Sequence, residues 1–186
     1  MEGAQRARGA GGQLPDPRVR PGGRVQVPLG LRARRRVGTE ERVSAERAFL
    51  GGRLTLRALP VIHGRPERPV LDGGRILLPA GEFAQVVNGE EARFVAYLEF
   101  LAGPGLARGG HYHERKGEAL YVIRGRIRAR FADADSGVTE ELTLGPGDLV
   151  RTAPRLAHRY EALEYAQAIE FSTTPFDPDD VVAWGF

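Results

Sequence analysis

The chain has 186 residues, a length that suits one domain with an appendage. It contains no cysteine, which excludes disulfides, thiolate metal sites and cysteine nucleophiles. The net charge of +3 is small and no apolar run can span a bilayer, so we expect neither nucleic acid nor a membrane as a partner. The N-terminus also lacks the apolar segment of a signal peptide, which predicts a cytoplasmic protein.

The beginning of the chain differs in composition from the rest. Residues 1–38 are rich in glycine, proline and arginine, which bury little surface, so we expect a poorly structured, flexible extension. Residues 39–186 are predicted to form the folded domain. Its one long helical candidate covers residues 39–50, and the glycine pair that follows would end it.

From about residue 53 the pattern changes to short runs of β-forming residues separated by turn formers. Alternation is clearest where Ile127, Ala129 and Phe131 share one face between arginines, which is typical of a strand with one buried side. Many short strands at this spacing predict an all-β sandwich or barrel. The predicted strands cover residues 53–62, 75–79, 93–102, 118–125, 126–132, 139–145, 147–153, 158–163 and 167–172.

Two of the four histidines, His111 and His113, stand one residue apart. In a strand they point to the same face, so both imidazoles can bind one metal ion. A short turn leads to Glu118, which opens the next strand and brings a carboxylate to the same ion. Farther along the chain, His158 follows a turn at Pro154 and supplies a third imidazole. This ligand set suits one divalent ion per chain (Fe, Mn, Ni, Co or Zn) and leaves positions open for water, oxygen or substrate.

These residues carry a resemblance to the cupin superfamily. The first cupin motif reads Gly, five residues, His-x-His, three or four residues, Glu, six residues, Gly. In this sequence the motif is met at every position, by Gly105, His111, His113, Glu118 and Gly125.

The second cupin motif reads Gly, five residues, Pro-x-Gly, two residues, His, three residues, Asn. Gly147 and His158 meet it with the correct separation. Ala153, Arg155 and Ala162 stand where proline, glycine and asparagine are expected, which puts the loop before His158 in doubt but not the ligand itself.

The resemblance implies a cupin-type double-stranded β-helix, a jelly-roll barrel with its site inside the mouth. It implies a metal site made by His111, His113, Glu118 and His158, with the three histidines as candidate catalytic bases, and it implies a homodimer. Polar residues in or near the strands are candidates for binding a small-molecule substrate, and each is equally consistent with a solvent-facing position. These candidates are Tyr97, Glu99, Tyr160, Arg151 and Glu170.

Three classes of function follow. The one that we favour from sequence is a mononuclear metal-dependent enzyme, an oxygenase, isomerase or lyase acting on a small polar substrate. The second is a nucleotide-sugar isomerase or epimerase acting on dTDP-4-keto-6-deoxy sugars by histidine acid–base catalysis, because EFSTTPFDPDD (170–180) resembles the tail of the 3,4-ketoisomerase cupins. The third is a non-catalytic cupin that binds a small ligand or senses a metal.

Overall fold

The computed structural model describes residues 45–68 and 70–186. The predicted extension over residues 1–38 lies outside this part. The strands within it, with two short 3-10 helices (η), are β1 (Arg47–Phe49), η1 (Leu50–Gly52), β2 (Leu54–Ala58), β3 (Val61–His63), β4 (Gly74–Leu78), β5 (Gly81–Gln85), β6 (Phe94–Phe100), β7 (Arg108–His113), β8 (Glu118–Arg124), β9 (Ile127–Asp133), β10 (Thr139–Leu144), β11 (Asp148–Thr152), β12 (Leu156–Ala162), β13 (Ala166–Ser172), η2 (Pro178–Asp180) and β14 (Val181–Ala183).

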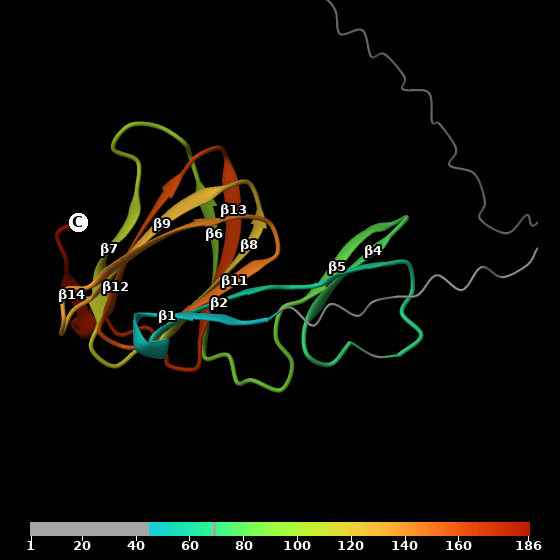
Figure 1. Ribbon diagram of the computed structural model, residues 1–186, viewed down its shortest axis with the longest axis horizontal. Coiled ribbons are helices and arrows are strands. Elements are labelled where there is room, and N and C mark those ends of the chain that lie inside the picture. Colours follow the sequence, from blue (N-terminus) through green and yellow to red (C-terminus); the bar gives the residue numbers. More distant parts are fainter. Residues whose placement is uncertain (1–44, 69) are drawn as a thin grey trace, which may run out of the picture. The chain divides into compact units, whose positions relative to one another are not determined.

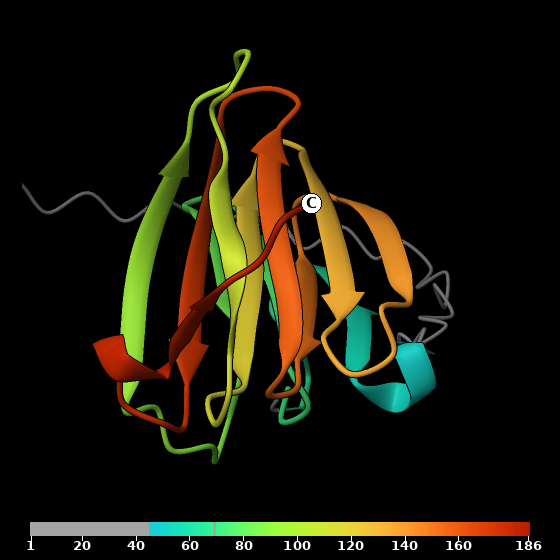
Figure 2. The same ribbon diagram turned by 90° about the vertical axis from the view of Figure 1, so that its left-hand side faces the viewer.

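The strands form three sheets (Figure 1). A six-stranded sheet has the order β1-β2-β11-β8-β13-β6, and a five-stranded sheet has the order β10-β9-β12-β7-β14. The third sheet, β3-β4-β5, includes the hairpin on the right of Figure 1. Figure 2 shows the C-terminal segment crossing in front of β7, with which β14 pairs. The structure confirms the predicted all-β class and its jelly-roll barrel.

The core lies between the two larger sheets. Leu120 and Val122 of β8 point into it from the six-stranded sheet. Ile127, Ala129 and Phe131 point into it from the five-stranded sheet and are fully buried, as their alternation predicted. The barrel interior is therefore filled by apolar side chains contributed alternately along each strand.

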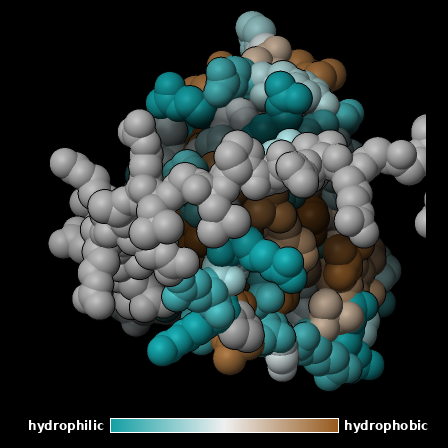
Figure 3. Space-filling model, turned by 90° about the vertical axis from the view of Figure 1, so that its right-hand side faces the viewer, coloured by the Kyte–Doolittle hydropathy of each residue, from teal (hydrophilic) through white to brown (hydrophobic). Residues whose placement is uncertain are grey.

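A second apolar cluster covers the outer face of the six-stranded sheet. Tyr121 and Phe171 belong to it, and the segment that follows β5 packs on them with Val86 and Val87. Figure 3, which looks onto the side where β4 and β5 lie in Figure 1, shows apolar surface gathered beside hydrophilic side chains. The outer face of this sheet is thus partly covered by the chain itself.

The helix predicted over residues 39–50 is wrong where the structure describes it. Arg47–Phe49 forms β1, antiparallel to β2, and Leu50–Gly52 forms the short helix η1. Gly51 and Gly52 have φ angles of 65° and 86°, which end helical geometry and allow a tight reversal. Pairing at the sheet edge outweighs the local helix propensity. Sequence patterns also missed β5 and β14, which are short and have no clear alternation.

Candidate functional site

The three histidines of the two motifs lie on neighbouring strands. β7 carries His111 and His113, and its antiparallel neighbour β12 places His158 directly opposite His111. The ring centroid of His111 lies 5.1 Å from that of His113 and 4.8 Å from that of His158. Two paired strands therefore bring the three imidazoles together.

A glycine and a β-bulge allow this close approach. The pairing of β7 with β12 shifts register between His158 and Arg159. Gly109 lies at this shift with a φ of 81°, and a Cβ there would stand 2.5 Å from the His158 carbonyl oxygen. Only glycine accommodates both conditions, so Gly109 helps to aim His158 at the site.

Glu118 reaches the histidines from the other large sheet. The turn at residues 114–117 leads from β7 to β8, whose first residue is Glu118. Its Oε1 lies 3.1 Å from His113 Nε2, and its Oε2 lies 3.2 Å from His158 Nε2. All three side chains are buried. The carboxylate thus lies between two imidazoles.

Lys116 joins this cluster, although sequence reasoning missed it. Its Nζ donates a hydrogen bond to Glu118 Oε1 at 2.6 Å and lies 3.4 Å from Glu170 Oε1. The ammonium also lies 4.1 Å from the centroid of the Phe94 ring, a cation–π contact. Lys116 is only 3% exposed. A lysine in a turn normally faces solvent, so no pattern in the sequence signals its burial.

The two carboxyl groups of the cluster titrate differently. Burial by itself raises the pKa of Glu118, but the hydrogen bond from His113 and the charges of His158 and Lys116 outweigh burial and hold this pKa well below its ordinary value. Burial raises the pKa of Glu170 to about 7, and the charge of Glu118 adds to the effect. Glu118 is therefore ionised at neutral pH, whereas Glu170 exchanges a proton there.

Two of the imidazoles, those of His111 and His158, have lowered pKa values. Burial lowers the pKa of His158 to about 4. Burial also lowers the pKa of His111, and the charge of His113 lowers it further. His111 is half-buried, whereas His113 and His158 are buried. His111 is thus the imidazole of the three that solvent or a ligand reaches best, and its lowered pKa keeps it neutral at pH 7.

Asp180, in η2, ties the C-terminal segment to the site. Its carboxylate accepts hydrogen bonds from the backbone N–H groups of Arg115, at 3.0 Å, and of Lys116, at 3.1 Å. Its Oδ2 lies 3.6 Å from His113 Nδ1. Asp180 is 3% exposed. Sequence reasoning missed this residue because its partners lie more than 60 residues earlier in the chain.

One of the predicted substrate-binding residues lies beside the histidines, and a second lies beside Lys116. Tyr160 stacks on His158 with a centroid distance of 5.3 Å and packs edge-on against Phe100 and Phe131 in the core. Burial raises the pKa of Tyr160 well above its ordinary value, so its hydroxyl stays protonated. Glu170 lies beside Lys116.

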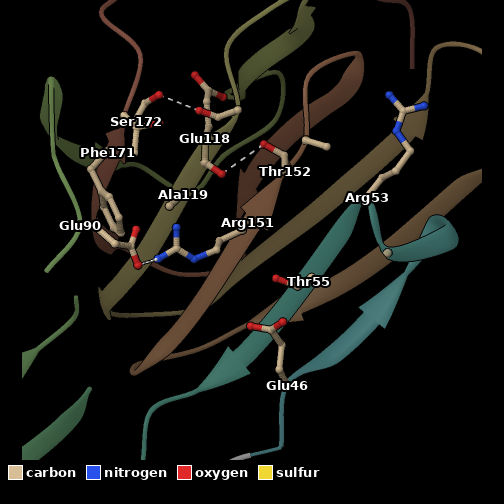
Figure 4. A pocket seen from close by; sticks show the side chains of 14 residues that line it. Glu46, Arg53, Thr55, Glu90, Glu118, Ala119, Arg151, Thr152, Phe171 and Ser172 are labelled. Carbon is tan, nitrogen blue, oxygen red and sulfur yellow. Dashed lines mark hydrogen bonds and ion pairs between the residues drawn. The ribbon is translucent and has the colours of Figure 1, made fainter. Parts of the chain in front are cut away.

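The structure does not bring the other three predicted substrate-binding residues to the histidines. Tyr97 and Glu99 are exposed on the outer face of β6, and the tyrosine hydroxyl donates to Glu99 at 3.0 Å. Arg151 pairs with Glu90 at 2.6 Å. It lines the pocket of Figure 4, where its guanidinium lies beside Glu90, and none of the histidines lines this pocket. Tyr97 and Glu99 face outward because β6 alternates and its other face packs on the core.

The donor types suit a divalent metal ion, but the side chains are not placed as metal ligands. Within residues 45–68 and 70–186, no group of three or more His, Asp or Glu side chains converges in a way that would hold an ion. Nδ1 of His113 and Nδ1 of His158 are buried without hydrogen-bond partners, whereas metal-binding histidines generally anchor their second nitrogen. The Glu118 carboxylate is already bonded to Lys116. The metal ion therefore stays a prediction, and no step below depends on it.

Comparison with known proteins agrees with the fold. Residues 98–171 match the model of the cupin domain family. A curated relative, UDP-2-acetamido-2,6-beta-L-arabino-hexul-4-ose reductase of Pseudomonas aeruginosa, is 32% identical over 82 residues, which are 43% of this chain and 22% of that protein. The chain thus matches less than a quarter of that relative's length.

Solved structures of sugar-nucleotide enzymes share the fold at low identity. dTDP-4-dehydrorhamnose 3,5-epimerase of Sulfolobus tokodaii has a TM-score of 0.58 at 19% identity, over 75% of this chain and 81% of that chain. The sugar 3,4-ketoisomerase of Thermoanaerobacterium thermosaccharolyticum, solved with TDP, has a TM-score of 0.54 at 14% identity, over 70% of this chain and 87% of that chain. Among the described residues, no helix has the length and apolar character needed to cross a membrane.

Proposed function

We propose that this protein with a cupin fold is a nucleotide-sugar isomerase or epimerase that acts by histidine acid–base catalysis. The observation that carries the proposal is His111, a half-buried imidazole with a lowered pKa, beside a buried cluster of charged side chains. The sugar-nucleotide neighbours support it, and they favour this reading over the metal-dependent enzyme that the sequence motifs put first. The curated relative also carries a UDP-linked sugar in its name.

The proposed reaction begins when His111 removes a proton from the carbon next to the ketone of a 4-keto sugar. The electron pair of the broken C–H bond forms the C=C bond of an enolate, and the ketone oxygen takes up the negative charge. In an epimerisation His111 releases this proton to solvent, and a solvent proton adds to the opposite face of the same carbon. In a 3,4-ketoisomerisation a proton adds at C4 while the hydroxyl proton of O3 moves to O4. Atoms and electrons balance in both cases without an oxidant.

A base for this step must be neutral before it accepts the proton. Burial and the charge of His113 lower the pKa of His111, so the neutral form is present at pH 7. His158 and His113 face the Glu118 carboxylate with their Nε2 atoms, so these nitrogens already have a partner. His111 is the residue that we assign as the base.

We also propose that the protein is a homodimer. β6 is an edge strand of the six-stranded sheet, and Val95 and Tyr97 on its outer face are 63% and 56% exposed. Unpaired edges with exposed apolar residues favour pairing with another chain. A second copy of this chain covering β6 would bury both side chains.

The test is hydrogen exchange in D2O with dTDP-4-keto-6-deoxyglucose and its UDP counterpart, followed by 1H NMR. The wild type should incorporate deuterium next to the ketone, and His111→Asn should be slower by a factor on the order of 100. His63→Asn is the matched control, because His63 is an exposed histidine of β3. Absence of exchange with the folded wild type, or equal rates in His111→Asn, would overturn the proposal.

A further inference from the structure

The chain contains a single lysine, and this lysine is buried at the candidate site. Arginine supplies every other side-chain cation. Lys116 is 3% exposed, and its Nζ contacts Glu118 Oε1 at 2.6 Å, Glu170 Oε1 at 3.4 Å and the Phe94 ring centroid at 4.1 Å. The second aromatic ring of this surrounding, Phe176, has its centroid 5.8 Å away. The ammonium thus lies between two carboxyl groups and two aromatic rings.

A buried ammonium is stable here only because charged and aromatic partners offset the cost of its burial. A lysine loses the hydration of its charge and the freedom of its long side chain when it is buried, so it stays inside only with charged partners. Its backbone is held as well, because the Lys116 N–H donates to Asp180 Oδ2 at 3.1 Å. An ammonium is a compact point charge, whereas a guanidinium is a planar fork that needs more room. A small cation is therefore what this place in the barrel accommodates.

The Lys116 ammonium is bonded to the Glu118 carboxylate, which a metal ion at this site would need as a ligand. Glu118 Oε1 accepts from Lys116 and also faces His113 Nε2 at 3.1 Å, while Oε2 faces His158 Nε2 at 3.2 Å. A divalent ion bound to a carboxylate lies about 2.0–2.2 Å from the oxygen. An ion on Glu118 would consequently stand close to the Lys116 ammonium, in a buried site where the repulsion is poorly screened. Glu170 and Phe94 also contact the ammonium and help to hold it in place.

We propose that Lys116 is the resident cation of this site and that it excludes divalent metal ions from the His111–His113–His158 cluster. The three histidines and Glu118 retain the donor types of a metal centre, but the lysine prevents them from binding a metal ion. This inference goes beyond the proposed function, because it concerns metal binding and holds whatever the substrate is. Loss of the lysine would leave Glu118 and Glu170 without their shared cation and open the carboxylate to a metal.

The experiment is a Co²⁺ titration of the full chain, purified without a histidine tag, followed by its visible absorption and by metal content after dialysis. The wild type should bind no stoichiometric Co²⁺. Lys116→Gln and Lys116→Met should each bind about one ion, with an affinity higher than the wild type by a factor on the order of 10 to 100. The double variant Lys116→Gln, His113→Ala should lose this ion, which separates the site from exposed His63. Circular dichroism shows which variants are folded, and two different side chains at position 116 guard against one that is not.

Two outcomes would overturn the inference. The first is a wild type that binds one Co²⁺, lost in His113→Ala, with an affinity that Lys116→Gln does not raise. The second is a folded Lys116→Gln or Lys116→Met protein that binds no more Co²⁺ than the wild type. Because the readout is metal binding, either of these Co²⁺ results would overturn this inference without bearing on the proposed sugar-nucleotide activity. A negative exchange assay would likewise leave this inference untouched.

Discussion

Glu118 and His158 lie in different sheets and 40 positions apart in the chain, yet Glu118 Oε2 is 3.2 Å from His158 Nε2. The same carboxylate bonds the Lys116 ammonium through its other oxygen. Glu118 therefore links the two sheets of the barrel through charged groups in its interior. We therefore expect both the stability of the barrel and the charges of the site to depend on this side chain.

Removing the charge of Glu118 should destabilise the protein far more than removing a similar charge at the surface. Glu118→Gln leaves the buried Lys116 ammonium with an incomplete partner, which typically costs about 3–5 kcal/mol. Glu90→Gln is the matched control, because Glu90 pairs with Arg151 at the same distance of 2.6 Å but is exposed. Its loss should cost about 0–1 kcal/mol. Urea unfolding measures the loss of unfolding free energy in both variants. Equal losses would contradict the role of Glu118 as the partner of a buried charge.

The pH dependence of stability should reveal two buried groups that oppose each other. His158 has a folded pKa of about 4, below the ordinary histidine value of 6.5. The unfolded chain therefore binds the proton first, and stability falls as the pH drops from 6.5 to 4. Glu170 has a folded pKa of about 7, above the ordinary glutamate value of 4.5. The folded chain therefore binds the proton first, and stability rises as the pH drops from 7 to 4.5. In the wild type the two effects largely cancel between pH 6.5 and 4.5.

Glu170→Gln should remove this cancellation. Its free energy of unfolding should fall by about 2 kcal/mol between pH 6.5 and 5, at about 1.36 kcal/mol per pH unit for one group, whereas the wild type should change less. Urea unfolding at the two pH values makes the comparison. A variant with the same pH dependence as the wild type would show that Glu170 does not titrate in this range.

Gly109, beside the β-bulge, should be needed for the site and not only for the stability of the fold. Gly109→Ala places a Cβ against the His158 carbonyl oxygen at a positive φ, so we expect a loss of about 1–3 kcal/mol together with a loss of sugar exchange activity. Gly137→Ala is the control, because Gly137 also has a positive φ, of 71°, but no neighbour within 4 Å of its Cβ position. It should lose less stability and keep its activity. Equal activity in the two variants would contradict the role of Gly109.

The exposed face of β6 should determine the oligomeric state. Val95→Asp and Tyr97→Glu place a charge where a second copy would bury an apolar side chain, so each should shift the protein from dimer to monomer. Light scattering coupled to size-exclusion chromatography measures the mass. Val138→Asp is the control, because Val138 is also exposed, at 55%, but lies in the turn between β9 and β10. A monomeric wild type would end the dimer proposal.

The local pattern of the sequence was sufficient for much of the barrel. Alternation identified the buried face of β9, because apolar residues at every second position have only one way to share a core. The spacing of His111, His113, Glu118 and His158 placed four polar side chains near one another, because strands and short turns carry spacing directly into space. The local pattern predicted a helix at residues 47–50, and this prediction was wrong because sheet pairing outweighed helix propensity.

Only the tertiary structure decided what surrounds these four residues. The burial of Lys116 and its contact with Glu170 depend on strands far apart in the chain, and the hydrogen bonds of Asp180 depend on where the C-terminal segment crosses β7. Likewise, the sequence of β6 does not indicate which of its faces is buried, because both faces carry apolar residues. The structure places Tyr97 on the exposed face, outside the barrel. Sequence periodicity records which residues share a face, whereas the packing of one sheet on another decides which face becomes the interior and which charges meet there.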